Sequence, residues 1–270
     1  MKIIVITGAS DGIGAEMARQ LAGELGAQVA LVLAARDEAR LRQVANQCVA
    51  LGAQTLVVPT DVSLQADCRA LITATVAAYG RIDAFINNAG MSAQALFEDV
   101  KADDLAWYEQ LMRVNLWGSV WCTHAALPYL KQSRGSIVAV SSLAGLIGIP
   151  GRTAYSATKF AMTGFFEALR AELKTAGVSV TIAYPGVVAT QIRYHGLNAA
   201  GQAAGSSGLK EDNAMSVEEC AQLILQGMES RQREVVMTAK GKLGRWLKLI
   251  VPARVEAMAL AALKDEVKPS

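Results

Sequence analysis

The chain has 270 residues, of which 52% are hydrophobic and 19% are charged, and its formal net charge at pH 7 is +2. This composition is typical of an ordinary globular protein, and the length suits one α/β domain with a full hydrophobic core. Because charges of both signs are interspersed, the sequence lacks the basic footprint of a nucleic-acid-binding protein, and a small-molecule partner is expected.

Short β-branched runs alternate with helical patterns as far as about Met237. In chain order, the predicted elements are strand Lys2–Thr7, a helix from Ile13 to the stop at Gly26, strand Gln28–Ala34, helix Asp37–Leu51, strand Gln54–Val58, helix Leu64–Tyr79, strand Ile82–Ile86, helix Asp104–Leu130, strand Ser136–Val140, helix Thr153–Thr175, strand Val178–Ala183, helix Ser216–Met228 and strand Glu234–Met237. Glycines directly after several helices act as stops, and Ser216 with Glu219 forms a capping box.

Strands that alternate with helices indicate a parallel sheet covered by helices on both faces. Right-handed crossovers then produce a doubly wound sheet, in which ligands bind beyond the carboxyl ends of the strands. Chemistry-bearing residues directly follow the strands at Gly8, Asn88, Ser142 and Tyr184–Gly186. We therefore expect one α/β domain over residues 1–238, with its ligand site at this edge of the sheet.

A glycine-rich loop, Thr7-Gly8-Ala9-Ser10-Asp11-Gly12-Ile13-Gly14, joins the first strand to the first helix. Glycine is needed where the backbone turns sharply or approaches a pyrophosphate, and the helix start offers unpaired N–H groups to the phosphates. The loop therefore predicts a dinucleotide site. The residues expected to contact the dinucleotide here are Gly8, Ser10, Asp11, Gly12, Ile13 and Gly14.

The end of the second strand selects the adenosine half of the cofactor. An acidic side chain at this place would bond the ribose hydroxyls of NAD, but the chain has Arg36 after two alanines. A guanidinium offers a planar fork to a 2′-phosphate, so NADP(H) is favoured over NAD(H). The following Asp37 is interpreted as the cap of the next helix.

Together these residues resemble the short-chain dehydrogenase/reductase family, from the first strand to about Met237. The motifs that carry the resemblance, in the family's order and spacing, are Thr7-Gly8 to Gly14, Asp61-Val62, Asn87-Asn88-Ala89-Gly90, Asn115, Ser142, Tyr155 to Lys159 and Pro185-Gly186. The resemblance implies a single-domain Rossmann fold with a seven-stranded parallel sheet in the order 3-2-1-4-5-6-7. It also implies a homodimer or homotetramer, paired through helices Asp104–Leu130 and Thr153–Thr175.

The resemblance assigns roles to individual residues. It makes Ser142, Tyr155 and Lys159 the catalytic set, together with Asn115, which would hold a proton-relay water. The further cofactor contacts that it implies are Asp61 and Val62 at the adenine, Asn88, Ala89 and Gly90 beside the central sheet, Tyr155 and Lys159 at the reacting centre, and Pro185, Gly186, Val188 and Thr190 at the nicotinamide. Many NADP-preferring members carry a basic residue where this chain has Asp11, so the cofactor preference depends mainly on Arg36.

Tyr155 and Lys159 are four residues apart on a predicted helix, so their side chains lie on one face. Free tyrosine has a pKa of about 10, which is too high for easy proton exchange at neutral pH. An ammonium about 4 Å away supplies roughly 4 kcal/mol in favour of the phenolate at an effective dielectric of 20. Lys159 can therefore turn Tyr155 into a working acid, while Ser142 donates to the substrate oxygen.

The remaining titratable residues give no sign of a metal site. The four cysteines are far apart in the chain, which favours buried free thiols in a reducing, cytoplasmic compartment. The early apolar run Lys2–Thr7 is interpreted as a core strand rather than a signal peptide. His124 is expected to pack in its helix, and His195 lies in the presumed substrate loop, where a direct contact to substrate is weighed but not favoured.

Two segments bear on the substrate. The Gly- and Ala-rich residues 191–215 are a candidate lid. Ser141–Gly145 and Tyr155–Phe160 are similar to the family branch that contains 11β-hydroxysteroid dehydrogenase type 1 and lipid-ketone reductases, which suggests a hydrophobic substrate.

Residues 239–270 form an extension in which two amphipathic helices are predicted. The first has the apolar stripe Leu243, Trp246, Leu247, Ile250 and Val251. The second has the stripe Val255, Met258, Ala259, Ala262 and Leu263. The alternatives are packing on its own subunit or a twin, a hydrophobic rim at the pocket mouth, and peripheral membrane contact through residues 239–264.

The favoured function is an NADP(H)-dependent oxidoreductase that moves a hydride between nicotinamide and a carbonyl or alcohol carbon. One alternative is a fold that binds NADP(H) as a sensor or scaffold without turnover, since fold alone does not imply catalysis. A weaker alternative is another Rossmann enzyme, such as a methyltransferase, which predicts no role for Tyr155.

Overall fold

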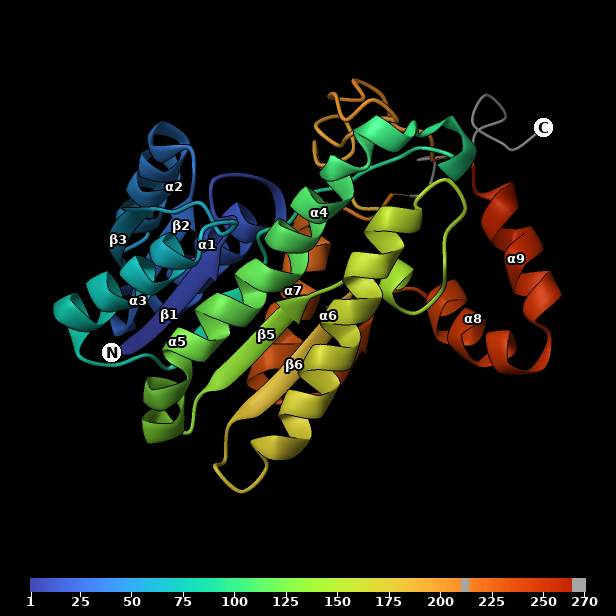
Figure 1. Ribbon diagram of the computed structural model, residues 1–270. Helices are drawn as coiled ribbons and strands as arrows, with labels where there is room; N and C mark the ends of the chain where they lie inside the picture. The colour runs from blue at the N-terminus through green and yellow to red at the C-terminus, as the bar shows by residue number, and fades with distance from the viewer. Residues whose placement is uncertain (210–213, 264–270) are drawn as a thin grey trace.

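Seven parallel strands form one sheet in the order β3-β2-β1-β4-β5-β6-β7, as the computed structural model shows (Figure 1). The structure describes residues 1–209 and 214–263. The strands are β1 (Lys2–Thr7), β2 (Val29–Ala35), β3 (Gln54–Pro59), β4 (Ala84–Asn87), β5 (Ser136–Val140), β6 (Ser179–Tyr184) and β7 (Glu234–Val236). The order and the parallel pairing confirm the predicted doubly wound Rossmann fold.

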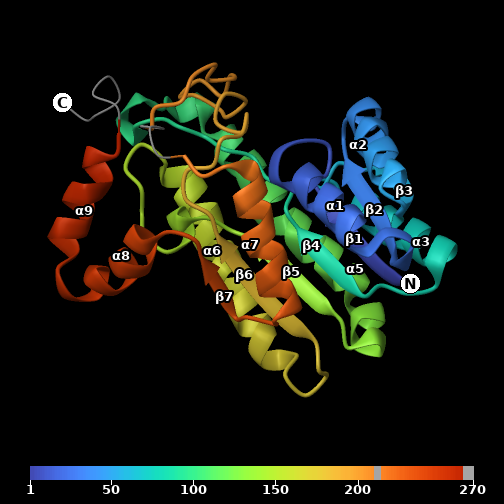
Figure 2. The ribbon, with the colours of Figure 1, turned by 180° about the vertical axis from the view of Figure 1, so that it is seen from behind.

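Helices cover both faces of the sheet, because side chains along each strand point alternately to the two sides. Ile4 and Ile6 of β1 face one helical layer, and Ile3 and Val5 face the other. The first layer is α1 (Gly12–Leu25), α2 (Glu38–Ala50) and α7 (Val217–Glu229), and the second is α3 (Gln65–Tyr79), α5 (Gly118–Ser133) and α6 (Thr153–Glu172). Figures 1 and 2 show the second and the first layer respectively in front of the sheet.

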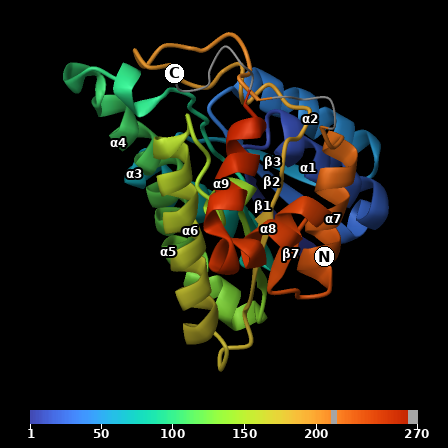
Figure 3. The same cartoon turned by 90° about the vertical axis from the view of Figure 1, so that its right-hand side faces the viewer.

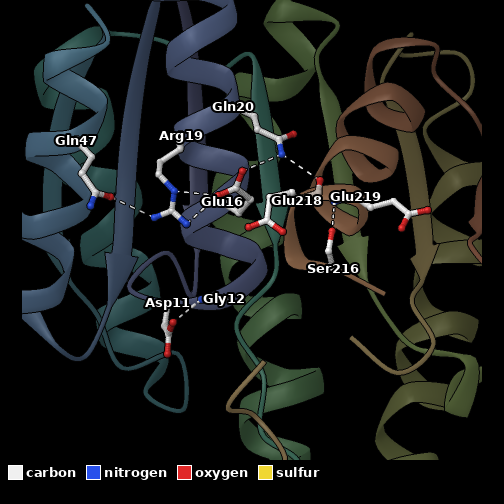
Figure 4. Close-up of polar contacts among 9 residues, drawn as sticks. All are labelled: Asp11, Gly12, Glu16, Arg19, Gln20, Gln47, Ser216, Glu218 and Glu219. Atoms are coloured by element: carbon white, nitrogen blue, oxygen red, sulfur yellow. Dashed lines mark hydrogen bonds and ion pairs between the residues drawn. The ribbon is translucent and has the colours of Figure 1, made fainter. Parts of the chain in front are cut away.

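Helices α1 and α7 lie side by side behind the glycine-rich loop (Figure 4). The Gln20 side-chain amide donates to the Glu218 carbonyl across the two helices, at 3.0 Å. The hydroxyl of Ser216 accepts from the backbone N–H of Glu219, which is the predicted cap at the start of α7. These contacts fix the start of α7 against α1.

The predicted helix Asp104–Leu130 is irregular at its centre. It begins as α4 (Ala106–Met112), passes through a π-helical turn (Arg113–Trp117) and continues as α5. The prediction of an uninterrupted α-helix was wrong there, because apolar periodicity does not reveal one wider turn. The other predicted boundaries agree with the structure within three residues. Short 3₁₀ turns occur at Gly26–Gln28, Phe97–Asp99, Ala102–Asp104 and Leu143–Gly145.

The C-terminal extension contains two helices, α8 (Ala239–Ile250) and α9 (Pro252–Ala261), at the end of the molecule farthest from β3 (Figures 1 and 3). Val255, Ala259 and Leu263 of the predicted second stripe are buried, whereas Met258 and Ala262 are exposed. The first stripe faces mostly outward. Among the described helices, none is both long and apolar enough to cross a membrane.

All four cysteines are buried free thiols. Burial raises the pKa of Cys48 to about 11 and that of Cys220 to about 12. Since only the thiolate reacts readily, we expect none of the thiols to react with a disulfide reagent at pH 8 in the native protein. After unfolding in guanidinium chloride, four thiols per chain should react. Rapid native labelling of any one cysteine would contradict the buried placement.

Candidate active site

The glycine-rich loop lies at the carboxyl end of β1, held by the turn that follows β4. The side-chain amide of Asn88 donates to the carbonyls of Thr7 and Gly8, at 3.0 and 3.1 Å. The hydroxyl of Thr7 accepts from the backbone N–H groups of Asn88 and Ala89, both at 3.1 Å. Within the sequence motif Asn87–Gly90, the side chain of Asn88 therefore holds the glycine-rich loop.

Two glycines of this loop leave no room for a side chain. A methyl group on Gly14 would lie 2.3 Å from the Gly8 carbonyl oxygen, and one on Gly8 would lie 2.8 Å from the Ala89 backbone. Gly8 also has a φ of +67°, which L side chains rarely adopt. The loop backbone consequently approaches the opposite turn closely, which suits a cradle for a pyrophosphate.

We expect Gly14→Ala to destabilise the protein by about 3 kcal/mol, because the added methyl group meets backbone atoms that cannot easily move. Gly23→Ala in the same helix is the matched control: Gly23 is exposed and has nothing within 4 Å of the new methyl group. That variant should be more stable by about 0.5–1 kcal/mol. Urea unfolding of both variants measures the effect, and equal stability of Gly14→Ala and the wild type would contradict the close packing.

A cleft of about 750 Å³ opens between this loop, the ends of β2 and β3, and the segment after β6. The predicted cofactor contacts that line it are Gly8, Ser10, Asp11, Gly12, Ile13, Arg36, Asp61, Val62, Asn88, Ala89, Gly90 and Thr190. Further lining residues, which the sequence patterns did not assign to the cofactor, are Ala35, Asp37, Arg40, Thr60, Met91, Ser92, Val114, Gln191, Ile192 and His195. His195, in the presumed substrate loop, thus lines the cleft.

The adenosine end of the cleft contains a second cation that the sequence patterns did not single out. Arg36 and Arg40 both line it, and the Arg40 guanidinium lies 3.6 Å from the Asp11 carboxylate and 3.4 Å from that of Asp37. Asp11 also accepts from the Gly12 backbone N–H at 2.7 Å (Figure 4). Arg40 therefore offsets the negative charge at Asp11. Arg40 follows Arg36 by four residues, about one helical turn, and this spacing is the sequence signal that could have identified Arg40.

The inner end of the cleft is organised by Asn115, which the π-helical turn places in the interior with no exposed surface. Its side-chain oxygen accepts from the Met91 backbone N–H at 2.7 Å, and its amide donates to the Met91 carbonyl and the Thr158 hydroxyl. A methyl group on Gly90 would lie 3.3 Å from the Asn115 side-chain oxygen and 3.8 Å from the Lys159 ammonium. Asn115 therefore positions this loop against α6.

Tyr155 and Lys159 lie on the inner face of α6, and both are buried. The Lys159 ammonium is 5.8 Å from the centre of the Tyr155 ring and donates to the Val140 carbonyl at 2.9 Å, at the end of β5. Burial lowers the pKa of Lys159, and the neighbouring Tyr155 opposes this shift. The arrangement places a buried cation close to a phenol at the carboxyl edge of the sheet.

Ser142 follows β5 and caps a 3₁₀ turn. Its hydroxyl oxygen accepts from the Ala144 backbone N–H at 3.2 Å, so the hydroxyl proton remains available to another acceptor. A methyl group on Gly145 would lie 2.7 Å from the Lys159 carbonyl. The turn that follows Ser142 is thus packed directly against α6, the helix that carries Tyr155 and Lys159.

Arg152 is a residue near this centre that the sequence patterns did not reveal. It is only 9% exposed, its guanidinium carbon lies 4.5 Å from the centre of the Tyr155 ring, and it donates to the Ala93 carbonyl and the Ser92 hydroxyl. Burial lowers the pKa of Arg152; Tyr155 opposes this, and Arg193 adds to it. Arg152 therefore ties the loop after β4 to the ring of Tyr155. An arginine three residues before a tyrosine carries no recognisable signal without the fold.

Fewer residues of the segment after β6 line the cleft than the resemblance implied. Pro185 and Val188 are buried, and the Pro185 carbonyl accepts from the Leu143 backbone N–H at 2.9 Å. Gly186 lies against Thr238 and Leu143. Thr190 alone of these predicted contacts lines the cleft, next to Gly12. Gln191, Ile192 and His195 of the predicted lid, residues 191–215, line the cleft, and residues 210–213 of that segment lie outside the described residues.

A family model described as short chain dehydrogenase matches residues 2–201. The chain belongs to the short-chain dehydrogenase family. This membership confirms the resemblance recognised from the motifs.

Curated relatives of this short-chain dehydrogenase include plant and amoebal proteins. The chain is 42% identical over 188 residues to an 11-beta-hydroxysteroid dehydrogenase-like 4A of Arabidopsis thaliana. The aligned region covers 69% of this chain and 61% of that protein. It is 33% identical over 272 residues to a dehydrogenase/reductase SDR family protein 7-like of Dictyostelium discoideum, which covers 99% of this chain and 83% of the relative.

Solved structures show the same fold along nearly the whole chain. A short chain dehydrogenase/reductase from Burkholderia phymatum in complex with NAD has a TM-score of 0.80 at 26% identity, covering 94% of each chain. An alcohol dehydrogenase from the archaeon Thermococcus sibiricus, complexed with 5-hydroxy-NADP, has a TM-score of 0.73 at 25% identity, covering 87% of this chain and 94% of the other. Nicotinamide dinucleotides thus occur with both structural relatives.

Proposed function

We propose that this short-chain dehydrogenase is an NADP(H)-dependent oxidoreductase that interconverts a carbonyl group and a secondary alcohol of a small, hydrophobic substrate. The observation that carries the proposal is the phenol of Tyr155 beside the buried ammonium of Lys159, which itself adjoins Gly90 of the cofactor cleft. The close-packed glycines, the cleft volume and the cations at its adenosine end all fit a dinucleotide.

The nicotinamide, when bound, supplies the hydride in reduction and accepts it in oxidation. In reduction Tyr155 gives its proton to the carbonyl oxygen, and in oxidation it takes the proton back from the alcohol. Lys159 stabilises the phenolate that remains, and Ser142 donates its free hydroxyl proton to the substrate oxygen as negative charge develops there. Asn115 and Arg152 act as positioning residues for this group.

A hydrophobic substrate is supported by the surroundings of Tyr155. Its ring packs in an apolar cluster with Ala93, Trp107, Leu111 and Ala144. Several relatives are named as 11-beta-hydroxysteroid dehydrogenases, which agrees with an apolar substrate. Charged residues near the ring, such as Arg152, are engaged with backbone and hydroxyl groups.

Parallel titration with NADPH and NADH, followed by a screen of apolar ketones and aldehydes with the tighter cofactor, tests this proposal. We expect tighter binding of NADPH and turnover of at least one apolar ketone. Tighter binding of NADH would overturn the cofactor assignment. Binding of NADPH without turnover across the panel would favour the sensor or scaffold alternative.

We also propose a homo-oligomer formed through α4, α5 and α6. A groove of about 540 Å³ lies between these helices, and Trp117, which is 46% exposed, stacks there on Trp121 at 5.9 Å. Trp117→Glu would bury a charge in such an interface, so we expect it to give a monomer by light scattering at micromolar concentration. Val49→Glu on the opposite layer is the control and should keep the wild-type mass. A monomeric wild type, or an unchanged mass for Trp117→Glu, would refute this interface.

A further inference from the structure

Helix α8 packs on its own subunit with one side and presents four large apolar residues to solvent on the other. Leu243, Trp246, Leu249 and Ile250, here called the outer face of α8, are 57%, 62%, 72% and 77% exposed. Figure 3 shows α8 and α9 at the β7 edge of the sheet, facing the viewer, with α5 and α6 on one side and α7 on the other. An exposed cluster of this kind marks a surface for interaction.

The opposite side of α8 is locked against the protein, so the outer face cannot turn inward. A methyl group on Gly241 would lie 2.4 Å from the Leu143 side chain, and one on Gly244 would lie 2.9 Å from that of Ile147. Lys248 donates to the Leu146 carbonyl at 2.9 Å and lies over the Phe160 ring. Arg245, on the same side, is paired with Glu234. A side chain at either glycine would require Leu143 or Ile147 to move.

Two lysines border the outer face. Lys242 precedes Trp246 by four residues, and Lys240 precedes Leu243 by three, so each lies beside the apolar residues on a different flank. Both lysines are exposed, and α8 contains no acidic residue. Apolar and aromatic side chains flanked by basic ones are what an interfacial helix needs to insert its apolar face and hold its charges at anionic headgroups.

We propose that α8 docks this protein on the surface of an anionic lipid bilayer, with its outer face inserted at the level of the headgroups. Leu143 and Ile147, which α8 contacts, lie in the segment directly after Ser142. Docking therefore brings the substrate side of the site next to the bilayer. The proposal concerns binding alone and does not depend on the redox assignment.

A second copy of the chain fits the outer face less well. A two-fold contact would pair the same surface on both subunits and bring Lys240 and Lys242 of one copy close to those of the other. From Ala239 to Ala261 the chain has five basic residues and a single acidic one, Glu256. Like charges would thus meet without enough carboxylates to balance them. A negatively charged surface complements this region instead.

Flotation with phosphatidylcholine vesicles, with and without phosphatidylserine, tests the docking. We expect the full-length protein to float with the phosphatidylserine vesicles. The double variant Lys240→Gln/Lys242→Gln should bind the phosphatidylserine vesicles about thirtyfold more weakly, because each lysine contributes about fivefold to the affinity. Leu249→Ser/Ile250→Ser should lose about a hundredfold in affinity. Val49→Ser/Leu51→Ser removes two exposed apolar residues at the end of α2 and directly after it, and should bind like the wild type.

Binding of NADPH and far-ultraviolet circular dichroism verify that each variant is folded. The fluorescence of Trp246 gives an independent readout: vesicles should shift the emission of the wild type to the blue, and Trp246→Phe should lose that shift. Absence of flotation by the wild type would overturn the proposal, as would equal flotation of all variants or indifference to phosphatidylserine. An oligomer that Leu249→Ser/Ile250→Ser dissociates, without vesicle binding by the wild type, would assign the outer face to a second copy.

Discussion

Tyr155→Phe is expected to lower kcat about a thousandfold while leaving the affinity for NADPH within about threefold of the wild type. The substitution removes only the hydroxyl group that carries the proton. The ring should keep its place, because Arg152 and the apolar cluster of Trp107 and Ala144 hold it. Steady-state turnover of the ketone found in the substrate screen, together with fluorescence titration of NADPH, measures the two quantities separately.

Tyr108→Phe is the matched control. The Tyr108 hydroxyl bonds to the Thr153 hydroxyl at 2.8 Å, at the start of the helix that carries Tyr155, yet it has no part in the proposed chemistry. Its kcat should stay within about twofold of the wild type. A fully active Tyr155→Phe would remove the basis of the redox proposal and favour another kind of Rossmann enzyme.

Arg36→Ala/Arg40→Ala is expected to weaken NADPH binding at least about a hundredfold and to leave NADH binding nearly unchanged. Each guanidinium would form a charge-assisted hydrogen bond to the 2′-phosphate, and such bonds contribute about 1.5–3 kcal/mol each. Removing Arg40 also leaves Asp11 and Asp37 without their cation, which adds repulsion toward the phosphate. Titrations with NADPH, NADH and 2′,5′-ADP separate the contribution of the phosphate from that of the nicotinamide.

Arg42→Ala tests whether any nearby cation would have the same effect. Arg42 lies in the same helix, but its guanidinium is paired with Glu38 and does not line the cleft. The affinity of the Arg42→Ala variant for NADPH should equal that of the wild type. If the double variant bound NADPH and NADH with the wild-type ratio, the adenosine end would not select the phosphate.

Much of the site could be predicted from local chemistry. The glycines of the first loop are required by backbone conformation and close approach, and such requirements are visible in the sequence itself. The four-residue spacing of Tyr155 and Lys159 fixes their common face once a helix is inferred. Arg36 could be placed at the adenosine end because the end of the second strand was clear from its apolar run.

Other features depend on contacts between distant segments. Arg152 bonds to Ser92 and Ala93, about sixty residues away, and no spacing rule connects them. The π-helical turn contains Asn115, whose side chain bonds to Met91 and Thr158 in distant segments. Arg40 gains its meaning only from the folded position of Asp11.

The sequence by itself determined the order of elements, the phosphate loop and the family, because hydrophobic periodicity, glycine conformation and residue spacing are local properties. Only the tertiary structure decided which face of α8 meets the protein. The amphipathic pattern predicted an apolar stripe but not its direction. The glycines at 241 and 244 approach Leu143 and Ile147 so closely that the stripe is directed to solvent, and this choice depends on packing between segments about a hundred residues apart.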